Sequence, residues 1–399
     1  MKGSKISLLL MFLLMLTGCN KVIVDKLPKD YYIKTSDTNY EIYEEISLKD
    51  IIKETNITID NIKIVPKKLG KNTYDWYFKI NKKKYLYHIN YNVVDTTEPK
   101  IYGGPNKTFY VGNEQNICDL VMYGDNYDRD PQCTVDGDYD FNKVGTYKVK
   151  ISVTDSSSNR NNFNMTINVI DPPKKNDKDT NNTKAEPTKV LFSDVLDKYK
   201  TEDTEIGIDV SRWQGDVDYT KIKDAGAEFV LMRIGVQQDL NEEISMDSKF
   251  KQNIKNAKKA DLKVGVYLYS MAMSKEESIK QAKWIIKQLK HEKIDLPIVF
   301  DWENWSKWNT YKLSFYDINE IADSFMKTVE DAGYTAMLYS SKFYLENIWE
   351  NRNNYDVWLA HYTNNTLSDY NGKYKFWQLC SDGKIDGISG DVDIDVFYK

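Results

Sequence analysis

The sequence predicts a multidomain chain: two small all-β sandwiches, followed by an irregular α/β barrel of eight strands and about five helices. Three observations predict this architecture. Residues 20–171 show alternating strand patterns punctuated by turn residues. A polar, charged stretch without apolar periodicity follows from residue 172 to about 203. From residue 204 to 399, strand and helix patterns alternate, which is typical of a sheet covered by helices.

The N-terminus has the pattern of an export signal. Lys2 and Lys5 precede an apolar run over residues 6–16, which is too short for an ordinary membrane-spanning helix. The sequence Leu16-Thr17-Gly18-Cys19 resembles the bacterial lipobox. That resemblance implies removal of residues 1–18 and a lipid on Cys19; the alternative is an ordinary secretory signal with an incidental cysteine. A diacyl anchor would hold the chain firmly, at about 0.8 kcal/mol per buried CH₂ group.

The amino-acid composition argues against some functions for this chain and favours others. The net charge of -5 and the absence of a recognition motif argue against nucleic-acid binding. With 3 His in the chain, a His-rich metal site or a His-based triad is not expected. The 29 Tyr and 9 Trp suit β-rich modules and carbohydrate contacts. Cys118 and Cys133 either pair in an oxidising exterior or remain free, and Cys380 is expected to be a buried apolar residue.

The two β blocks, residues 19–95 and 96–171, form an internal repeat of about 75 residues. In each block two strand patterns flank a turn, at 81–84 in the first and 155–160 in the second. The second block contains Val144-Gly145-Thr146-Tyr147 followed by Val153-Thr154-Asp155. Through these residues it resembles bacterial immunoglobulin-like surface domains, and the first block is a looser match. We expect spacer modules; the alternative is binding of wall or protein.

The segment 172–203 is predicted to be a flexible linker, with a short helix over 190–199 near its end. About 32 flexible residues span roughly 30 Å on average. The strands and helices of the barrel follow from residue 204. Strands are predicted at 206–210, 229–235, 264–269, 296–300, 335–339, 357–360, 374–379 and 392–396, and helices at 219–225, 247–260, 274–289 and 315–332.

Candidate chemistry begins with the apolar run 296–300, which leads into Asp301 and Glu303. Alternation along a strand puts both acids on one side, about 6–7 Å apart by Cα spacing. This is near the geometry for cleaving a glycosidic bond, where one carboxyl stays protonated and the other is ionised. The alternative is two solvated acids at a strand end.

Further polar residues are expected at the same rim, because reactive residues of such barrels lie at the C-terminal ends of strands. Asp209 ends the first strand, while Asp393 and Asp395 lie in the eighth, next to the first if the barrel closes. Crowded carboxylates raise one another's pKa. Groove-lining candidates, each with core packing as the alternative, are Tyr267, Tyr339, Trp358 and Gln378.

A series of short motifs runs through the whole predicted barrel: Gly207-Ile208-Asp209-Val210-Ser211, Trp213-Gln214-Gly215, Phe229-Val230, Arg233-Ile234-Gly235, Gly265-Val266-Tyr267, Phe300-Asp301-Trp302-Glu303, Trp358-Leu359-Ala360, Tyr362, Trp377-Gln378 and Gly390-Asp391-Val392-Asp393-Ile394-Asp395. Through these motifs, residues 205–399 resemble glycoside hydrolase family 25, the Chalaropsis-type lysozymes. The motifs occur in family order, although the family pattern usually has Asn where Asp395 stands.

The resemblance implies hydrolysis of the β-1,4 bond between N-acetylmuramic acid and N-acetylglucosamine in peptidoglycan, with an irregular TIM-like barrel as the fold. It implies that Glu303 is the general acid, and that Asp301 orients the substrate N-acetyl group as internal nucleophile. Asp209 and Asp393 would support that pair, and no metal or cofactor would be needed. Retention or inversion of stereochemistry stays open. The implied substrate-binding residues are Tyr267, Tyr339, Trp358, Gln378 and Asp395.

For the whole chain we expect an extracytoplasmic muramidase, anchored to the outer face of the bacterial membrane through Cys19. The β modules and linker would lift the barrel toward the wall glycan. The expected partners are peptidoglycan strands, the membrane and proteins of an envelope-spanning machine. One competing class is a non-catalytic wall-binding or assembly protein, which would be expected to have lost Asp301 or Glu303. Another is a hydrolase of a different N-acetylated glycan.

Overall fold

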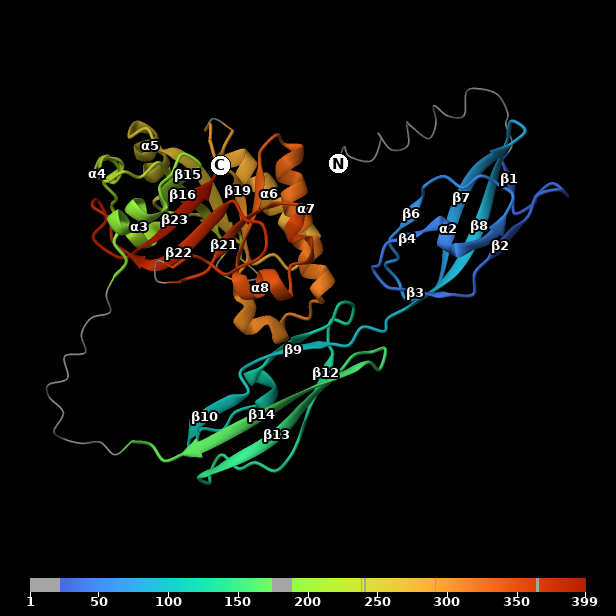
Figure 1. Cartoon of the computed structure of the whole chain (residues 1–399), viewed down its shortest axis with the longest axis horizontal. Coiled ribbons are helices and arrows are strands. Elements are labelled where there is room, and N and C mark those ends of the chain that lie inside the picture. Colours follow the sequence, from blue (N-terminus) through green and yellow to red (C-terminus); the bar gives the residue numbers. More distant parts are fainter. Residues whose placement is uncertain (1–21, 174–188, 238, 240–241, 291, 364–365) are drawn as a thin grey trace. The chain divides into compact units, whose positions relative to one another are not determined.

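The computed structural model describes residues 22–173, 189–237, 239, 242–290, 292–363 and 366–399 (Figure 1). The predicted signal (1–18), the lipid site at Cys19 and most of the predicted linker lie outside these ranges. The chain divides into two compact units, Met1–Thr97 and Glu98–Lys399. In the described parts, no helix has the length and apolar character needed to cross a membrane.

The first unit is built around a long hairpin of β7 (Gly70–Ile80) and β8 (Lys83–Val94). Asn81 and Lys82 both have positive φ, as a two-residue hairpin turn requires. Trp76 and Ile89 are buried at the centre of the core. The remaining elements are β1 (Ile23–Val24), β2 (Ile33–Thr35), β3 (Asn39–Glu41), β4 (Ile46–Ser47), α2 (Leu48–Ile51), β5 (Ile52–Thr55) and β6 (Lys63–Ile64).

The second β block opens the other unit and also has a long hairpin, of β13 (Gly145–Thr154) and β14 (Arg160–Ile170). In both blocks a short strand pairs in parallel with the second arm: β3 with β8, and β10 (Asn106–Tyr110) with β14. The shared pattern supports the predicted repeat, whereas the immunoglobulin-like resemblance stays a prediction. The other elements are β9 (Lys100–Tyr102), η1 (Ile117–Leu120), β11 (Met122–Gly124) and β12 (Gln132–Asp136).

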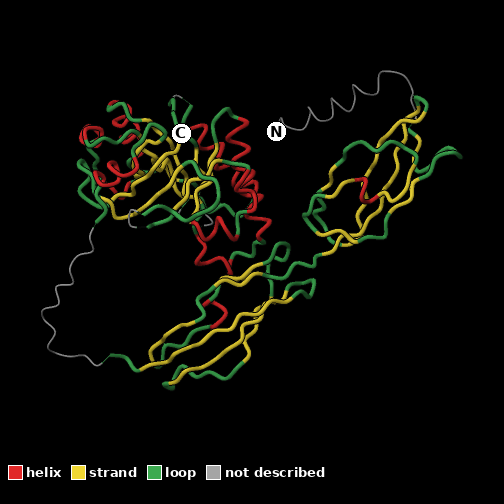
Figure 2. The backbone as a smooth tube through the Cα atoms, viewed as in Figure 1, coloured by secondary structure: helices red, strands yellow, loops and turns green. Residues whose placement is uncertain are grey.

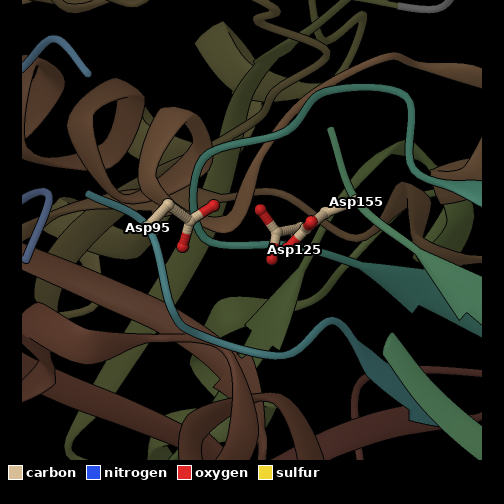
Figure 3. A group of neighbouring side chains, drawn as sticks. All are labelled: Asp95, Asp125 and Asp155. Atoms are coloured by element: carbon tan, nitrogen blue, oxygen red, sulfur yellow. The ribbon is translucent and has the colours of Figure 1, made fainter. Parts of the chain in front are cut away.

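Cys118 and Cys133 form a disulfide in this block, so the paired alternative holds. The bond closes a loop that carries β11. Asp125, at the end of β11, and Asp155, after β13, are both buried. A carboxylate oxygen of one lies within 4.8 Å of one of the other. Figure 3 shows the two side chains next to each other.

The barrel is a sheet whose first strand, β15 (Thr204–Val210), pairs with both the second and the last strand. Eight strands close the ring, and β17 (Ser245–Met246) adds to the edge of β16. The last strand, β23 (Val392–Tyr398), is antiparallel to both of its neighbours, so the closing side is irregular as predicted. The other strands are β16 (Phe229–Val236), β18 (Lys263–Tyr269), β19 (Ile298–Asp301), β20 (Ala336–Ser341), β21 (Asp356–Ala360) and β22 (Phe376–Gly383).

Helices are concentrated in the barrel part, as the red segments of Figure 2 show. The side chain of Ser274 accepts a hydrogen bond from the Glu277 backbone N–H, which caps α6 as predicted. The helical elements of the barrel are η2 (Arg212–Gln214), α4 (Tyr219–Asp224), α5 (Phe250–Lys259), α6 (Lys275–Gln288), η3 (Asn304–Thr310), α7 (Phe315–Asp331), α8 (Lys342–Asn347) and η4 (Glu350–Asn353).

Two features differ from the predicted linker and spacer arrangement. Helix α3 (Phe192–Tyr199) belongs to the barrel, because Phe192 and Val195 are buried in its core. The barrel part therefore begins before residue 204. The second β block also packs directly on the barrel, with Tyr102 and Met122 against the same core. That packing is not the arrangement of a spacer.

Candidate active site

A pocket of about 290 Å³ lies at the C-terminal ends of the parallel barrel strands. Four acids line it: Asp209, Asp301, Glu303 and Asp393. A larger cavity of about 700 Å³ lies beside the first residues of β20 and β21, at the opposite end, without such an acid group. The other residues lining the acidic pocket are Ser211, Trp213, Gln214, Arg233, Tyr267, Tyr269, Tyr339, Trp358, Tyr362 and Gln378.

Strand register explains why three of the acids meet. Asp209 lies near the end of β15, and its partner in the antiparallel β23 is Asp393. Asp301 is the last residue of β19, with Tyr269 of β18 on one side and Tyr339 of β20 on the other. Neighbouring strands lie about 4.8 Å apart, so the predicted convergence follows from sheet closure.

Glu303 reaches the pocket from beyond its strand. The strand ends at Asp301, and Glu303 is the residue from which η3 begins. Between them Trp302 is buried on the other side, and its indole N–H donates to the carbonyl of Ala272 at 3.2 Å. The expectation that both acids belong to one strand is therefore wrong for Glu303, although both line the pocket.

The environment raises the pKa of both carboxyls. Burial is the main cause at Asp301, with the charge of Glu303 and a hydrogen bond to it adding in the same direction. The nearby guanidinium of Arg233 lowers the pKa of Asp301 and so opposes this shift. Glu303 lies at the pocket mouth as an exposed residue, but the protein around its carboxyl still raises its pKa. Two interacting acids of this kind can hold one proton between them.

The second group of acids has the same character. Burial raises the pKa of Asp393 to about 7. Burial first, and then the charges of Asp393 and Asp395, raise the pKa of Asp209 well above its ordinary range. A site with several neutral or shared-proton acids can donate and accept protons under mildly acidic to neutral conditions.

Gln378 connects these acids to the aromatic wall of the pocket. Its amide N–H donates to Asp209 at 2.8 Å. Its amide oxygen accepts hydrogen bonds from the hydroxyls of Tyr339 and Tyr362, both at 2.9 Å. The side chain of Gln378 is buried, so this network fixes the positions of one acid and two tyrosines.

Asp395 is placed differently from the prediction. It has no exposed surface and does not line the pocket. It accepts a hydrogen bond from the indole N–H of Trp358 at 2.8 Å. Because β23 runs antiparallel to β15, the step from Asp393 to Asp395 leads into the barrel, opposite Gly207. Asp395 thus supports lining residues and is not positioned to contact a ligand.

Several lining residues were absent from the predicted site. Arg233 is buried and ion-paired with Asp247 at 2.8 Å, and it also lies beside Asp301. Trp213 is 74% exposed after the end of β15, and Tyr362 follows the end of β21. Trp213 and Tyr362 lie just beyond strand ends, and this position was the signal that could have found them. Arg233 lies inside β16 and gave no such signal.

Comparison with known proteins adds to this geometry. Residues 208–388 match the family described as Glycosyl hydrolases family 25. The uncharacterized protein YegX of Escherichia coli strain K12 is 29% identical over 193 residues, covering 48% of this chain and 68% of that protein. The autolytic lysozyme of Clostridium acetobutylicum is 26% identical over 194 residues, covering 48% and 56%.

Among solved structures, a family 25 glycosyl hydrolase from Bacillus anthracis is 25% identical, with a TM-score of 0.42. The match covers 51% of this chain and 91% of that one. The family match falls on the strands that carry Asp209, Asp301 and the following Glu303. Residues 208–388 are therefore a domain of glycosyl hydrolase family 25.

Proposed function

We propose that this pocket hydrolyses the β-1,4 bond between N-acetylmuramic acid and N-acetylglucosamine in peptidoglycan. The observation that carries the proposal is the interacting pair of acids, Asp301 and Glu303, in a pocket with two further acids. A glycosidase needs one carboxyl that holds a proton and one that carries charge, and this pair supplies both.

The surroundings of each acid support a different role for it. Glu303 lies at the pocket mouth, where a leaving-group oxygen can reach it, and a raised pKa lets it hold the proton it donates. Asp301 lies deeper, and burial raises its pKa too, but the guanidinium of Arg233 beside it lowers that pKa and so favours the charged form. The Asp301 carboxylate can then orient a substrate N-acetyl group whose carbonyl oxygen attacks the anomeric carbon. Glu303 subsequently takes a proton from the water that opens this intermediate.

A neighbouring hollow of about 530 Å³ supports a long-chain substrate. It shares Glu303, Tyr339 and Tyr362 with the acidic pocket. Aromatic rings of Trp305 and Tyr344 line it, and flat rings suit the apolar faces of sugars. The catalytic acid would therefore stand between two binding regions, as cleavage inside a polymer requires.

The names of two relatives support peptidoglycan as the substrate. One is the autolytic lysozyme of Clostridium acetobutylicum, and the other is lysozyme M1 of Streptomyces globisporus, 26% identical over 206 residues. Peptidoglycan lies outside the membrane, which agrees with the export signal predicted for residues 1–18. Anchoring through a lipid on Cys19, and contacts with other envelope proteins, are part of this proposal.

The test is digestion of purified peptidoglycan by the full-length chain, followed by analysis of the new reducing ends. Muramic acid ends are expected. Glu303→Gln should abolish release, whereas Glu330→Gln, which changes an exposed glutamate on α7, should leave it unchanged. Glucosamine ends would refute the assigned bond, and undiminished release by Glu303→Gln would refute the assigned acid.

A further inference from the structure

The turn that begins at Glu303 has two sides, and each packs against a different part of the chain. Element η3 (Asn304–Thr310) is a 3₁₀ turn, a geometry with weak hydrogen bonds that depends on packing to persist. On the inner side, the rings of Trp305 and Trp308 lie 4.6 Å and 6.2 Å from that of Trp302, measured between centroids. The outer side faces the second β block.

Backbone groups of that block form hydrogen bonds with side chains on the outer side of the turn. The indole N–H of Trp308 donates to the Tyr123 carbonyl at 3.0 Å. The Asn309 amide N–H donates to the Val121 carbonyl at 2.8 Å, while its oxygen accepts from the Tyr123 backbone N–H at 3.1 Å. The Asn309 side chain thus pairs with the chain around β11 much as a neighbouring strand would.

The contact continues without a gap onto α7. At Gly124, an added Cβ would lie 2.8 Å from the ring of Phe315 and 2.9 Å from the indole nitrogen of Trp308. The Phe315 backbone N–H donates to the Asp125 carbonyl at 2.8 Å. Arg129 donates two hydrogen bonds of 2.7 Å to Asp317. This is core-like packing in which even a methyl group has no room.

Most of these groups belong to the single loop closed by the disulfide between Cys118 and Cys133. The carbonyl of Cys118 itself accepts a second, longer hydrogen bond of 3.4 Å from the Asn309 amide. A covalent closure restricts the conformations of such a loop. The disulfide therefore restricts the loop close to the residues that contact the 304–310 turn.

We infer that the disulfide-closed loop 118–133 is a positioning element of the active site. It holds the 304–310 turn, and through that turn it fixes the Glu303 carboxyl relative to Asp301. The loop does not contact substrate in this role; Trp308 and Asn309 transmit its effect. The inference rests on the proposed function of Glu303 as the catalytic acid. Positioning matters for such a group, because a displacement of about 1 Å can lower the rate roughly 100-fold.

The test compares Gly124→Val with Gly104→Val in the full-length chain. Gly104 lies in the same block, and an added Cβ there meets nothing closer than 3.8 Å. Gly124→Val should lower kcat on peptidoglycan at least about tenfold, with KM changed less than about twofold. Amide hydrogen exchange at residues 304–310 should accelerate. The high-pH limb of the rate profile should move to lower pH, because water that reaches Glu303 reduces its burial. Gly104→Val should match the original chain in all four measurements.

A second perturbation covers the case in which Gly124→Val fails to fold. Mild thiol reduction of the unmutated chain opens the bond between Cys118 and Cys133, and it should produce the same loss of kcat and the same faster exchange at 304–310. Reoxidation should reverse both. Unchanged kcat and unchanged exchange after reduction would overturn the inference. If the unmutated chain releases nothing from peptidoglycan, the proposed function fails, while the exchange measurement still decides whether the loop holds the turn.

Discussion

Replacing Gln378 with methionine tests the hydrogen-bond network behind the acidic pocket. Methionine has nearly the same shape as glutamine, so Gln378→Met removes polar atoms and leaves little cavity. Two buried groups would each lose one hydrogen bond: the Asp209 carboxyl, which accepts from the amide at 2.8 Å, and the Tyr339 hydroxyl, which donates to it at 2.9 Å. A neutral bond contributes about 0.5–1.5 kcal/mol and a bond to a charged group about 1.5–3 kcal/mol, so the free energy of unfolding should fall by about 2–4 kcal/mol.

The matched control is Tyr362→Phe. The Tyr362 hydroxyl donates to the same amide oxygen, but the residue is 52% exposed and the oxygen keeps its bond from Tyr339. This substitution should cost less than about 1 kcal/mol, since no buried group is left unpaired.

Urea unfolding followed by tryptophan fluorescence measures both variants. Every tryptophan except Trp76 lies after residue 203, so the signal reports mainly on the barrel. Gln378→Met should also raise the pKa of Asp209 further, because the amide donor favours its charged form. A loss of stability no larger than that of Tyr362→Phe would refute the idea that Gln378 holds the network together.

Three further predictions concern pH, the disulfide and a buried ion pair. Asp393 binds its proton more tightly in the folded than in the unfolded chain, so the free energy of unfolding should fall as pH rises from about 3.8 to about 7. Asp393→Asn should flatten that slope in urea titrations from pH 4 to pH 8; an unchanged slope would show that Asp393 is not responsible. Removing the disulfide with Cys118→Ser and Cys133→Ser opens a loop of 15 residues and should cost about 3 kcal/mol, visible as a lower Tm, with an equal Tm counting against the assigned bond. Arg233→Met leaves the Asp247 side chain buried without its ion-pair partner and should cost about 3–5 kcal/mol in denaturant unfolding; a cost below about 1 kcal/mol would mean that other donors suffice.

The rim acids could be predicted because strand polarity is a strong constraint. Once the strands of a barrel are placed, the residue that ends each parallel strand must lie at one end of the ring. This places Asp209 and Asp301 correctly without any contact information. The same rule fails for Asp395. Asp395 and Asp393 are two positions apart on one strand, so their side chains point to the same side, as predicted. Because this strand runs antiparallel to β15, Asp395 lies deeper in the barrel than Asp393. Strand direction at the closing side, and not side-chain alternation, decides its burial.

The packing of the second β block on the barrel could not be predicted from the sequence. Tyr123 and Asn309 are 186 positions apart, and no periodicity connects them. The local pattern of residues 118–133 reads only as a turn-rich loop between strands. Its partner surface, formed by Trp308 and Phe315, is indistinguishable in sequence from ordinary core residues. Non-local contacts of this kind can be recognised only in the folded structure, where both surfaces are formed.

Strand β23 pairs between β15 and β22, so the barrel can close only after this last strand has been synthesised. Asp393 lies in this strand, where it pairs with Asp209 of β15. A ribosome or an export channel releases residues in sequence, so a chain that lacks residues 392–398 has an open sheet and an incomplete acid group. The acid group of the pocket is therefore complete only after β23 has inserted between β15 and β22.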